Sequence, residues 1–351
     1  MEIKQDLLTM LELLQQPAFL VQDGIICRTN IAAGVYLLQP GTPVETMIPE
    51  AKQEYATFTE GSLSLAVEVG GVRVGACVTC MEQFQLFTLE HPAEQVQLQA
   101  MALSAQHLRK QLAGYMSAVE QLVQQAIPEQ AQLVAQIHHR SSQALRTIGN
   151  MSDAMYYAQP ENAWTESTEL CAFLEEILEK AAFYGKTAGI DLRWQLPNQP
   201  VYTMVDREKL ERALLNMLAN AMKYGGSSDV QVLLAVHNDR VRLSVSGYGE
   251  TALSVDAFQR YMRKPMLDDG RNGVGLGMVL IRGVAMAHGG AVLLDQPEPN
   301  RNRITLTLPL QKVNRSTLRT PVLHVDYAGE VDHVLLELSE VLPAEAYLSE
   351  I

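Results

Sequence analysis

The segment RALLNMLANAMKYGG places two amides and one cation on an otherwise apolar helical stretch. Asn216 and Asn220 are four residues apart, so they share one helix face, and Lys223 lies on the adjoining turn. An amide oxygen is the kind of hard donor that Mg²⁺ prefers, and a lysine brings a mobile positive charge to phosphates. The stripe therefore suits a magnesium-phosphate site, although buried asparagines bonded to backbone would give the same pattern.

Three glycines precede a second helix in GVGLGMVLIRGVAMAHGG. Gly273, Gly275 and Gly277 would let backbone N–H groups approach an anion, and the start of a helix favours negative charge. A pattern of this kind is weak evidence for phosphate binding when it stands alone. Upstream, AFQRYMRKP sets Phe258 and Tyr261 one helical turn apart.

The segment VRLSVSGYGE predicts a buried strand that runs into a turn at Gly247 and Gly249. A carboxylate near the end of such a strand would be well placed to contact a bound base or phosphate. The residue at this position is Val245, whose side chain makes no hydrogen bond. The segment thus keeps the shape of a nucleotide-binding turn and lacks one of its groups.

Two adjacent histidines lie in AQIHHRSSQALRTIGN, which reads as an amphipathic helix. An imidazole attacks a phosphoryl group only as a neutral base, and a neighbouring acid helps to maintain that state. Neither His138 nor His139 has an adjacent carboxylate, and Arg140 follows. The pair is either a reactive site, with His138 slightly preferred because it follows the apolar Ile137, or two solvated helix histidines.

Cys77 and Cys80 form a single CxxC within VRVGACVTC. This segment alternates like a strand, so the two thiols should point to opposite faces, and ordinary strand cysteines are expected. Four further residues of metal-binding type occur in the acidic tail, at His324, Asp326, Asp332 and His333. Their spacing fits no metal site, so we expect them to be solvated polar residues.

In order and spacing, residues 128–310 resemble a two-component sensor histidine kinase, with an ATP-binding domain of the GHKL superfamily after a dimerisation bundle. NMLANAMKY is similar to the N box of that family, AFQRYM to its F box, VSGYG to its G1 box and GVGLGM to its G2 box. The resemblance implies ATP and Mg²⁺ as cofactors, with Asn220 as the metal ligand. The nucleotide-binding positions that it implies are Asn216, Asn220, Lys223, Tyr224, Gly247, Gly249, Gly273, Gly275, Leu276 and Gly277.

The resemblance also implies autophosphorylation on His138 or His139 and transfer to a response regulator. Two departures from the family pattern bear on that activity. The G1 box has Val245 in place of aspartate, and the loss of a charge-assisted hydrogen bond costs about 1.5–3 kcal/mol. The H box lacks its acidic residue and its proline. The alternative is therefore a catalytically impaired pseudokinase that binds a response regulator or a partner kinase as a scaffold. A third interpretation is a serine kinase that acts on an anti-sigma antagonist. Such a kinase needs neither bundle nor coil, so the heptad spacing described below argues against it.

The elements that must position these residues predict a multidomain protein. The expected segments are an α+β PAS-like sensor domain at 1–90, a coiled-coil signalling helix at 91–127, a histidine-bearing dimerisation bundle at 128–186, an α/β-sandwich GHKL ATPase-like domain at 187–310 and a tail at 311–351. In the tail, LLELSEVLP is typical of an amphipathic docking helix. Within 1–90, Asp23-Gly24 and Gly70-Gly71 predict tight turns between strands.

Heptad spacing supports the coil. Met101, Leu108, Tyr115 and Leu122 recur every seven residues, and Ala105, Leu112, Val119 and Ala126 recur four positions later. This seam predicts a two-stranded coil and hence a homodimer. The next helix is expected to run to about residue 157, with Leu133, Ile137, Ala144, Ile148, Met151 and Met155 on its buried face, and to pair with a helix over 166–185.

Composition narrows the class of partner. The chain has 351 residues, of which 47% are hydrophobic, so it can bury substantial cores. Its formal net charge of −13 argues against broad nucleic-acid binding, which needs a basic face. No apolar run approaches the roughly 18 residues of a membrane span, and the polar N-terminus is not a signal peptide. We therefore expect a cytoplasmic protein.

Overall fold

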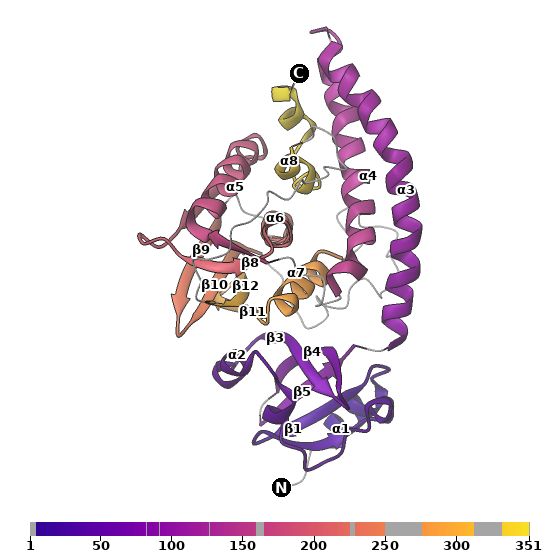
Figure 1. The fold of residues 1–351 in the computed structure, drawn as a ribbon, viewed down its shortest axis with the longest axis vertical. Coiled ribbons are helices and arrows are strands. Elements are labelled where there is room, and N and C mark those ends of the chain that lie inside the picture. Colours follow the sequence, from indigo (N-terminus) through magenta and orange to yellow (C-terminus); the bar gives the residue numbers. More distant parts are fainter. Residues whose placement is uncertain are drawn as a thin grey trace.

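The computed structural model describes residues 5–81, 83–90, 92–125, 127–158, 165–224, 229–249, 276–311 and 332–350. They form an N-terminal α+β part, a long helical hairpin and an α/β sandwich (Figure 1). The hairpin runs beside the sandwich, and the C-terminal residues lie between the two. Among the described residues, no helix combines the length and apolar character needed to cross a membrane.

The N-terminal part is a five-stranded antiparallel sheet in the order β2-β1-β5-β4-β3. Its elements are α1 (Gln5–Leu13), β1 (Ala18–Gln22), β2 (Ile25–Thr29), α2 (Lys52–Thr57), β3 (Ser62–Val69), β4 (Val72–Met81) and β5 (Phe84–Leu89). The predicted turns at Asp23-Gly24 and Gly70-Gly71 are confirmed, and all four residues have positive φ. Asn30 is buried and fully used: its Oδ1 accepts from the Ala18 and Ala33 amides, and its Nδ2 donates to two carbonyls.

The two cysteines of the CxxC point to different places, as their spacing predicts. Cys77 is buried in the core that includes the sandwich, whereas Cys80 packs against the N-terminal core. Burial raises the pKa of the Cys77 thiol to about 12, which removes its nucleophilic thiolate form at neutral pH. Among the residues with described positions, no group of metal-binding side chains is assembled.

Helices α3 (Pro92–Gln125) and α4 (Ala131–Ala158) pack against each other as an antiparallel hairpin. The second heptad row faces α4: Ala105 and Val119 are almost fully buried. The first row does not, because Leu108, Tyr115 and Leu122 are 43%, 51% and 51% exposed. Half of the predicted seam is therefore satisfied within the chain, and pairing of two chains through the other half stays a prediction.

The buried face of α4 differs from the expected one. Leu133 is 61% exposed, and Ala144 is also exposed. The positions that are buried instead are mostly polar, at His138, Ser141, Ser142, Arg146, Asn150 and Ser152. The reason is that α4 packs against α7 and the C-terminal residues as well as α3. The expected partner over 166–185 is a short strand followed by α5 (Leu170–Gly185), which packs into the sandwich core.

The sandwich places helices on a sheet in the order β11-β12-β10-β9-β7. Its elements are β6 (Glu166–Glu169), α5, β7 (Asp191–Gln195), β8 (Tyr202–Val205), α6 (Arg207–Tyr224), β9 (Asp229–His237), β10 (Arg240–Tyr248), α7 (Leu276–Ala287), β11 (Ala291–Glu298) and β12 (Arg301–Pro309). Strands β6 and β8 form a separate pair. The predicted α/β sandwich is confirmed, and its core joins aliphatic side chains of α5, α6 and α7 with those of the sheet.

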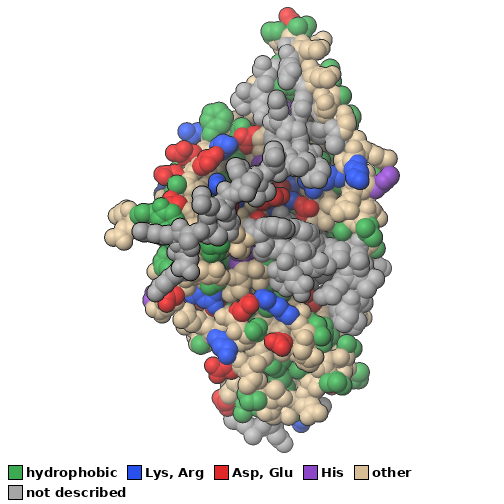
Figure 2. All heavy atoms as spheres, viewed as in Figure 1, with side chains coloured by type: hydrophobic (Ala, Val, Ile, Leu, Met, Phe, Trp, Pro, Cys, Tyr) green, Lys and Arg blue, Asp and Glu red, His purple; other side chains and the backbone are tan. Residues whose placement is uncertain are grey.

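The N-terminal part and the sandwich share one sheet. Strand β3 pairs antiparallel with β11 through Ser62–Ser64 and Val292–Leu294, which makes a sheet of ten strands. Two ion pairs cross the same boundary, Arg240 with Glu54 and Arg282 with Glu90, and the Arg73 guanidinium donates across it to the Met286 carbonyl. Figure 2 shows side chains of both charges along this boundary. The two parts are therefore joined by backbone hydrogen bonds as well as by side chains.

The C-terminal residues form a compact segment, named here the C-terminal segment (residues 332–350). It contains α8 (His333–Glu337) and a 3₁₀ turn at Ala344–Glu350. The Asp332 carboxylate caps α8 by accepting hydrogen bonds from the Val334 and Leu335 amides. Leu335, Leu338 and Tyr347 are fully buried, so this segment docks on the body of the protein.

Candidate functional site

Helix α6 is held firmly at its start. The Asp206 carboxylate accepts a hydrogen bond from the Lys209 amide, which caps the helix. The Asp206 amide donates to Nε2 of His288, just after α7, and Nδ1 of His288 lies 2.7 Å from the Val284 carbonyl. Nδ1 therefore carries the proton, and the neutral ring ties the start of α6 to the end of α7. Burial lowers the pKa of His288, which favours this neutral form.

The polar stripe of α6 faces the start of α7. A Cβ added to Gly277 would lie 2.9 Å from Oδ1 of Asn216, so only glycine allows this approach. The Asn220 amide nitrogen donates to Sδ of Met278 at 3.5 Å. Helix α6, which carries the two amides, and the end of the glycine-rich stretch therefore meet. Gly273 and Gly275 lie outside the described residues, as do Phe258 and Tyr261.

The motif VSGYG lies at the end of strand β10, and its two glycines have different roles. A Cβ on Gly247 would lie 3.1 Å from the Ala221 carbonyl of α6, so Gly247 lets the helix approach the sheet. The Gly249 amide donates to the Asn300 carbonyl at 2.7 Å and closes the end of the strand. Val245 is buried and paired with Val232 and Ile304 in register. The position expected to bear a carboxylate is part of the apolar core.

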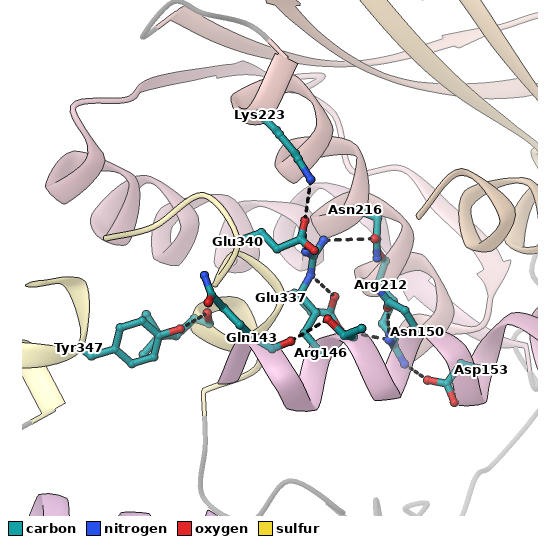
Figure 3. Close-up of polar contacts among 12 residues, drawn as sticks. Gln143, Arg146, Asn150, Asp153, Arg212, Asn216, Lys223, Glu337, Glu340 and Tyr347 are labelled. Carbon is teal, nitrogen blue, oxygen red and sulfur yellow. Dashed lines mark hydrogen bonds and ion pairs between the residues drawn. The ribbon is translucent and has the colours of Figure 1, made fainter. Parts of the chain in front are cut away.

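A row of alternating charges joins α6, α4 and the C-terminal segment (Figure 3). Glu340 Oε2 lies 3.3 Å from Nζ of Lys223 and 2.7 Å from Nη1 of Arg146. Glu337 lies 3.4 Å from Nε of Arg146 and 3.2 Å from Nη2 of Arg212. We call Arg212, Arg146 and Lys223 the cation row, because each of the two carboxylates bridges two of its members.

The cation row is largely removed from water. The side chains of Arg146, Arg212 and Lys223 are 5%, 13% and 13% exposed. The Arg146 guanidinium also donates to Asn216 Oδ1 at 3.5 Å, and Arg212 also contacts Asp153 and Asn150. Burial raises the pKa of Glu340, but Arg146 and Lys223 lower it further, so the net pKa lies below its usual range. The Glu340 carboxylate is thus charged at neutral pH.

The same C-terminal segment covers both candidate phosphoacceptors. His138 is 2% exposed, and its ring lies edge-on to the Tyr347 ring, with 5.0 Å between centroids. Nε2 of His139 lies 2.8 Å from the Ser339 carbonyl, so it donates its proton there. Burial lowers the pKa of His138, which keeps the ring neutral. In this arrangement His138 is closed to a substrate, and Nε2 of the half-buried His139 is occupied by its hydrogen bond to Ser339.

The structure thus assembles part of the predicted site. It brings together Asn216, Asn220, Lys223, Leu276, Gly277 and Gly247 around α6 and the start of α7. Tyr224 ends α6, and its side chain lies outside the described residues. His138 and His139 lie on α4 beneath the C-terminal segment, with Ser339 against His139 and its neighbour Glu340 against Lys223. One short stretch therefore touches both parts of the site.

Sequence reasoning identified Lys223 but missed the other two members of the cation row, Arg146 and Arg212, and the two carboxylates that pair with them. Arg212 extends the polar stripe of α6 by one turn, and Arg146 follows His138 at two successive intervals of four through Ser142. That polar periodicity was the available signal. His107 was also missed: it is exposed on α3, the other helix of the hairpin, and lies 3.4 Å from the Gln111 side chain.

Comparison with protein families identifies one matching region. Residues 205–312 match the family described as "Histidine kinase-, DNA gyrase B-, and HSP90-like ATPase". This region runs from the end of β8 through α6 and α7 to just beyond β12.

Several curated proteins are similar to the chain. The sensor histidine kinase YcbM of Bacillus subtilis (strain 168) is 22% identical over 204 residues, which cover 56% of this chain and 65% of YcbM. The adaptive-response sensory kinase SasA of Gloeothece citriformis (strain PCC 7424) is 26% identical over 239 residues, covering 63% of this chain and 60% of SasA. The chain thus matches less than two thirds of the length of these relatives.

Solved structures show similarity of the same kind. Histidine kinase ThkA in complex with the response regulator TrrA is 14% identical with a TM-score of 0.42, over 86% of this chain and 98% of ThkA. Full-length ShkA in complex with AMPPNP is 20% identical with a TM-score of 0.46, over 61% of this chain and 46% of ShkA.

Proposed function

Because the chain belongs to the family of two-component sensor histidine kinases, we propose that it binds magnesium nucleotide and acts as a catalytically impaired signalling scaffold. In this role the kinase architecture is used to bind a response regulator or a partner kinase. Its own His138 and His139 are not phosphorylated while the C-terminal segment is docked.

Nucleotide binding is supported by the meeting of α6 with the start of α7. Asn220 would supply a hard oxygen ligand to Mg²⁺, and Lys223 would neutralise phosphate charge. Gly277 lies against Asn216, which brings the N-terminal end of α7 to the amide stripe. A bound magnesium triphosphate would supply the transferable phosphoryl group of an active kinase.

Impaired catalysis is carried by one observation: the two histidines are covered, at 2% exposure for His138 and through a hydrogen bond to Ser339 for His139. A phosphoacceptor must approach the terminal phosphorus closely and in line. Val245 adds to the impairment, because a buried valine offers no acceptor to the amino group of adenine. Binding without base recognition would be weak.

The proposed homodimer is supported by the exposed surface of α3 and not by the nucleotide site. The exposed heptad row of Leu108, Tyr115 and Leu122 is suited to a second copy of the chain, which would complete a four-helix bundle. The N-terminal part would then be a PAS-like sensor domain that acts on the hairpin it leads into. The proposed location is the cytoplasm.

The experiment is a paired measurement of nucleotide binding and autophosphorylation. Calorimetric titration with Mg-ATP should give binding that Asn220→Ala abolishes. Incubation with labelled ATP should give no acid-labile label on the parent. If Val245 limits base recognition, Val245→Asp should tighten binding about ten- to hundredfold. Absence of binding in the parent and in Val245→Asp would refute the nucleotide-binding part of the proposal.

An active kinase is the second candidate, favoured by the assembled α6–α7 face and by the exposed imidazole of His107. Acid-labile label on the parent would support it and contradict the scaffold. Loss of that label in His138→Ala, His139→Ala or His107→Ala alone would identify the acceptor. His237→Ala is a suitable control, since that histidine is exposed at the far end of β9.

A further inference from the structure

The C-terminal segment presents two carboxylates to three cations that belong to other elements. The order in space is Arg212, Glu337, Arg146, Glu340 and Lys223, as Figure 3 shows for these side chains. Glu337 and Glu340 lie three residues apart, at the end of α8 and just beyond it. The row therefore holds two anionic groups side by side, supplied by a single short stretch.

The three buried cations of the cation row need anionic partners. Charges taken out of water are costly unless they are paired, and removal of one partner leaves the other uncompensated. Arg212 keeps Asp153 without the segment, but Arg146 is paired here with Glu337 and Glu340. If the C-terminal segment undocks, the cation row becomes an anion-binding site between α4 and α6. A chain of two or three linked phosphates carries charges that suit the row.

Lys223 connects this row to the nucleotide site, because it lies three residues from Asn220 on the same helix. Resting on the nucleotide-binding function proposed above, we propose that the C-terminal segment is an intramolecular competitor of the phosphate chain. Glu340 and Glu337 take the positions at Lys223 and Arg146 that a bound triphosphate would use. Phosphate binding and segment docking are then mutually exclusive.

The competition has a consequence for the histidines. Ser339, next to Glu340, holds His139, and Tyr347 covers His138. Displacement of the carboxylates would therefore also uncover this face of α4. The buried Leu335, Leu338 and Tyr347 oppose displacement, so the segment is held by apolar contacts as well as by charge. Because the two events are linked, phosphate binding weakens the docking of the C-terminal segment, and docking weakens phosphate binding by the same factor.

The test titrates the full chain with two probes, magnesium tripolyphosphate and Mg-ATP, by calorimetry. The double variant Glu337→Gln/Glu340→Gln keeps the shape of the segment and removes its charge. Glu345→Gln is the matched control, because Glu345 is exposed in the same segment. The double variant should bind tripolyphosphate about ten- to hundredfold more tightly than the parent, since charge-assisted contacts no longer compete. The control should match the parent.

Hydrogen exchange gives an independent reading on the parent itself. Saturating tripolyphosphate should speed exchange across residues 332–350 and leave β9 and β10 unchanged. No change in exchange at saturation would overturn competition, even if the double variant failed to fold. Equal tripolyphosphate affinities of a folded double variant and the control would overturn it as well.

The two probes separate this proposal from the proposed function. Tighter tripolyphosphate binding in the double variant without Mg-ATP binding would support competition and refute the nucleotide site. Mg-ATP binding that is identical in the parent, the double variant and the control would support the nucleotide site and refute competition.

Discussion

The core of the sandwich and the junction of α4, α6 and the C-terminal segment are both buried, but they are built from different residues. The core joins aliphatic side chains such as Leu214, Leu243 and Ile304. The junction holds Arg146 and Glu337 at similar depth. Burial of apolar area stabilises the core without direction, whereas the junction is stable only while each charge keeps its partner. The core is therefore suited to a fixed structure, whereas the junction is suited to the replacement of one charged partner by another.

The largest expected effect breaks the junction. Arg146→Ala removes one of the two cationic partners of Glu337 and one of the two of Glu340, so the free energy of unfolding should fall by about 3–5 kcal/mol. Urea denaturation of the parent and the variant measures this loss. Arg140→Ala on the exposed side of α4 is the control and should change stability by less than about 0.5 kcal/mol. A loss below about 1 kcal/mol for Arg146→Ala would show that the junction is not a buried ion-pair network.

A cavity in the core should cost nearly as much. Leu214 is fully buried on α6, and Leu214→Ala should destabilise the protein by about 3 kcal/mol through lost burial and the cavity left behind. Leu233→Ala on the exposed face of β9 serves as the control. If the two leucine variants unfold at the same urea concentration, the core assignment of α6 is wrong.

A paired replacement sharpens the difference between the regions. Arg146→Met combined with Glu337→Leu removes both charges and keeps apolar volume, so the loss should be about 1 kcal/mol or less. Leu214→Ala in the core has no equivalent compensating partner, because only a side chain that refills the cavity would restore the lost packing. A double variant as unstable as Arg146→Ala alone would mean that specific hydrogen bonds, such as the one to Asn216, dominate the junction.

The smallest effect concerns pH. Burial lowers the pKa of His288 below its unfolded value, so the neutral ring that accepts from the Asp206 amide stabilises the folded state above about pH 6.5. This contribution should fall as pH drops below that value, because the unfolded chain then binds the proton more readily. Thermal denaturation between pH 7.5 and 5.5 should show a smaller decrease in His288→Gln than in the parent. His138 contributes with the same sign, so part of the decrease should remain in the variant. Equal decreases in the two proteins would contradict the role given to His288.

Sequence patterns predicted the sandwich well because its signals are local. Strand alternation in 229–236 and 241–247 and the apolar face of 207–224 all reflect burial against one core. The contact of Asn216 with Gly277 also followed, from the joint presence of two motifs. Apolar spacing could not reveal that α4 buries a polar face, because that face is decided by segments nearly 200 residues away in sequence. The heptad row of α3 was recognisable, but its division between α4 and the surface depended on where the chain turns back.

The pairing of β3 with β11 also determines how the molecule can be divided. A fragment that begins after the hairpin would leave the backbone groups of Val292, Leu293 and Leu294 without the neighbour that Ser62–Ser64 provides. An open apolar strand of this kind recruits other chains, so the isolated ATPase-like fragment should self-associate in solution. Purification of that region alone would therefore call for the first 90 residues to be supplied alongside it, or for a charged side chain at Leu293.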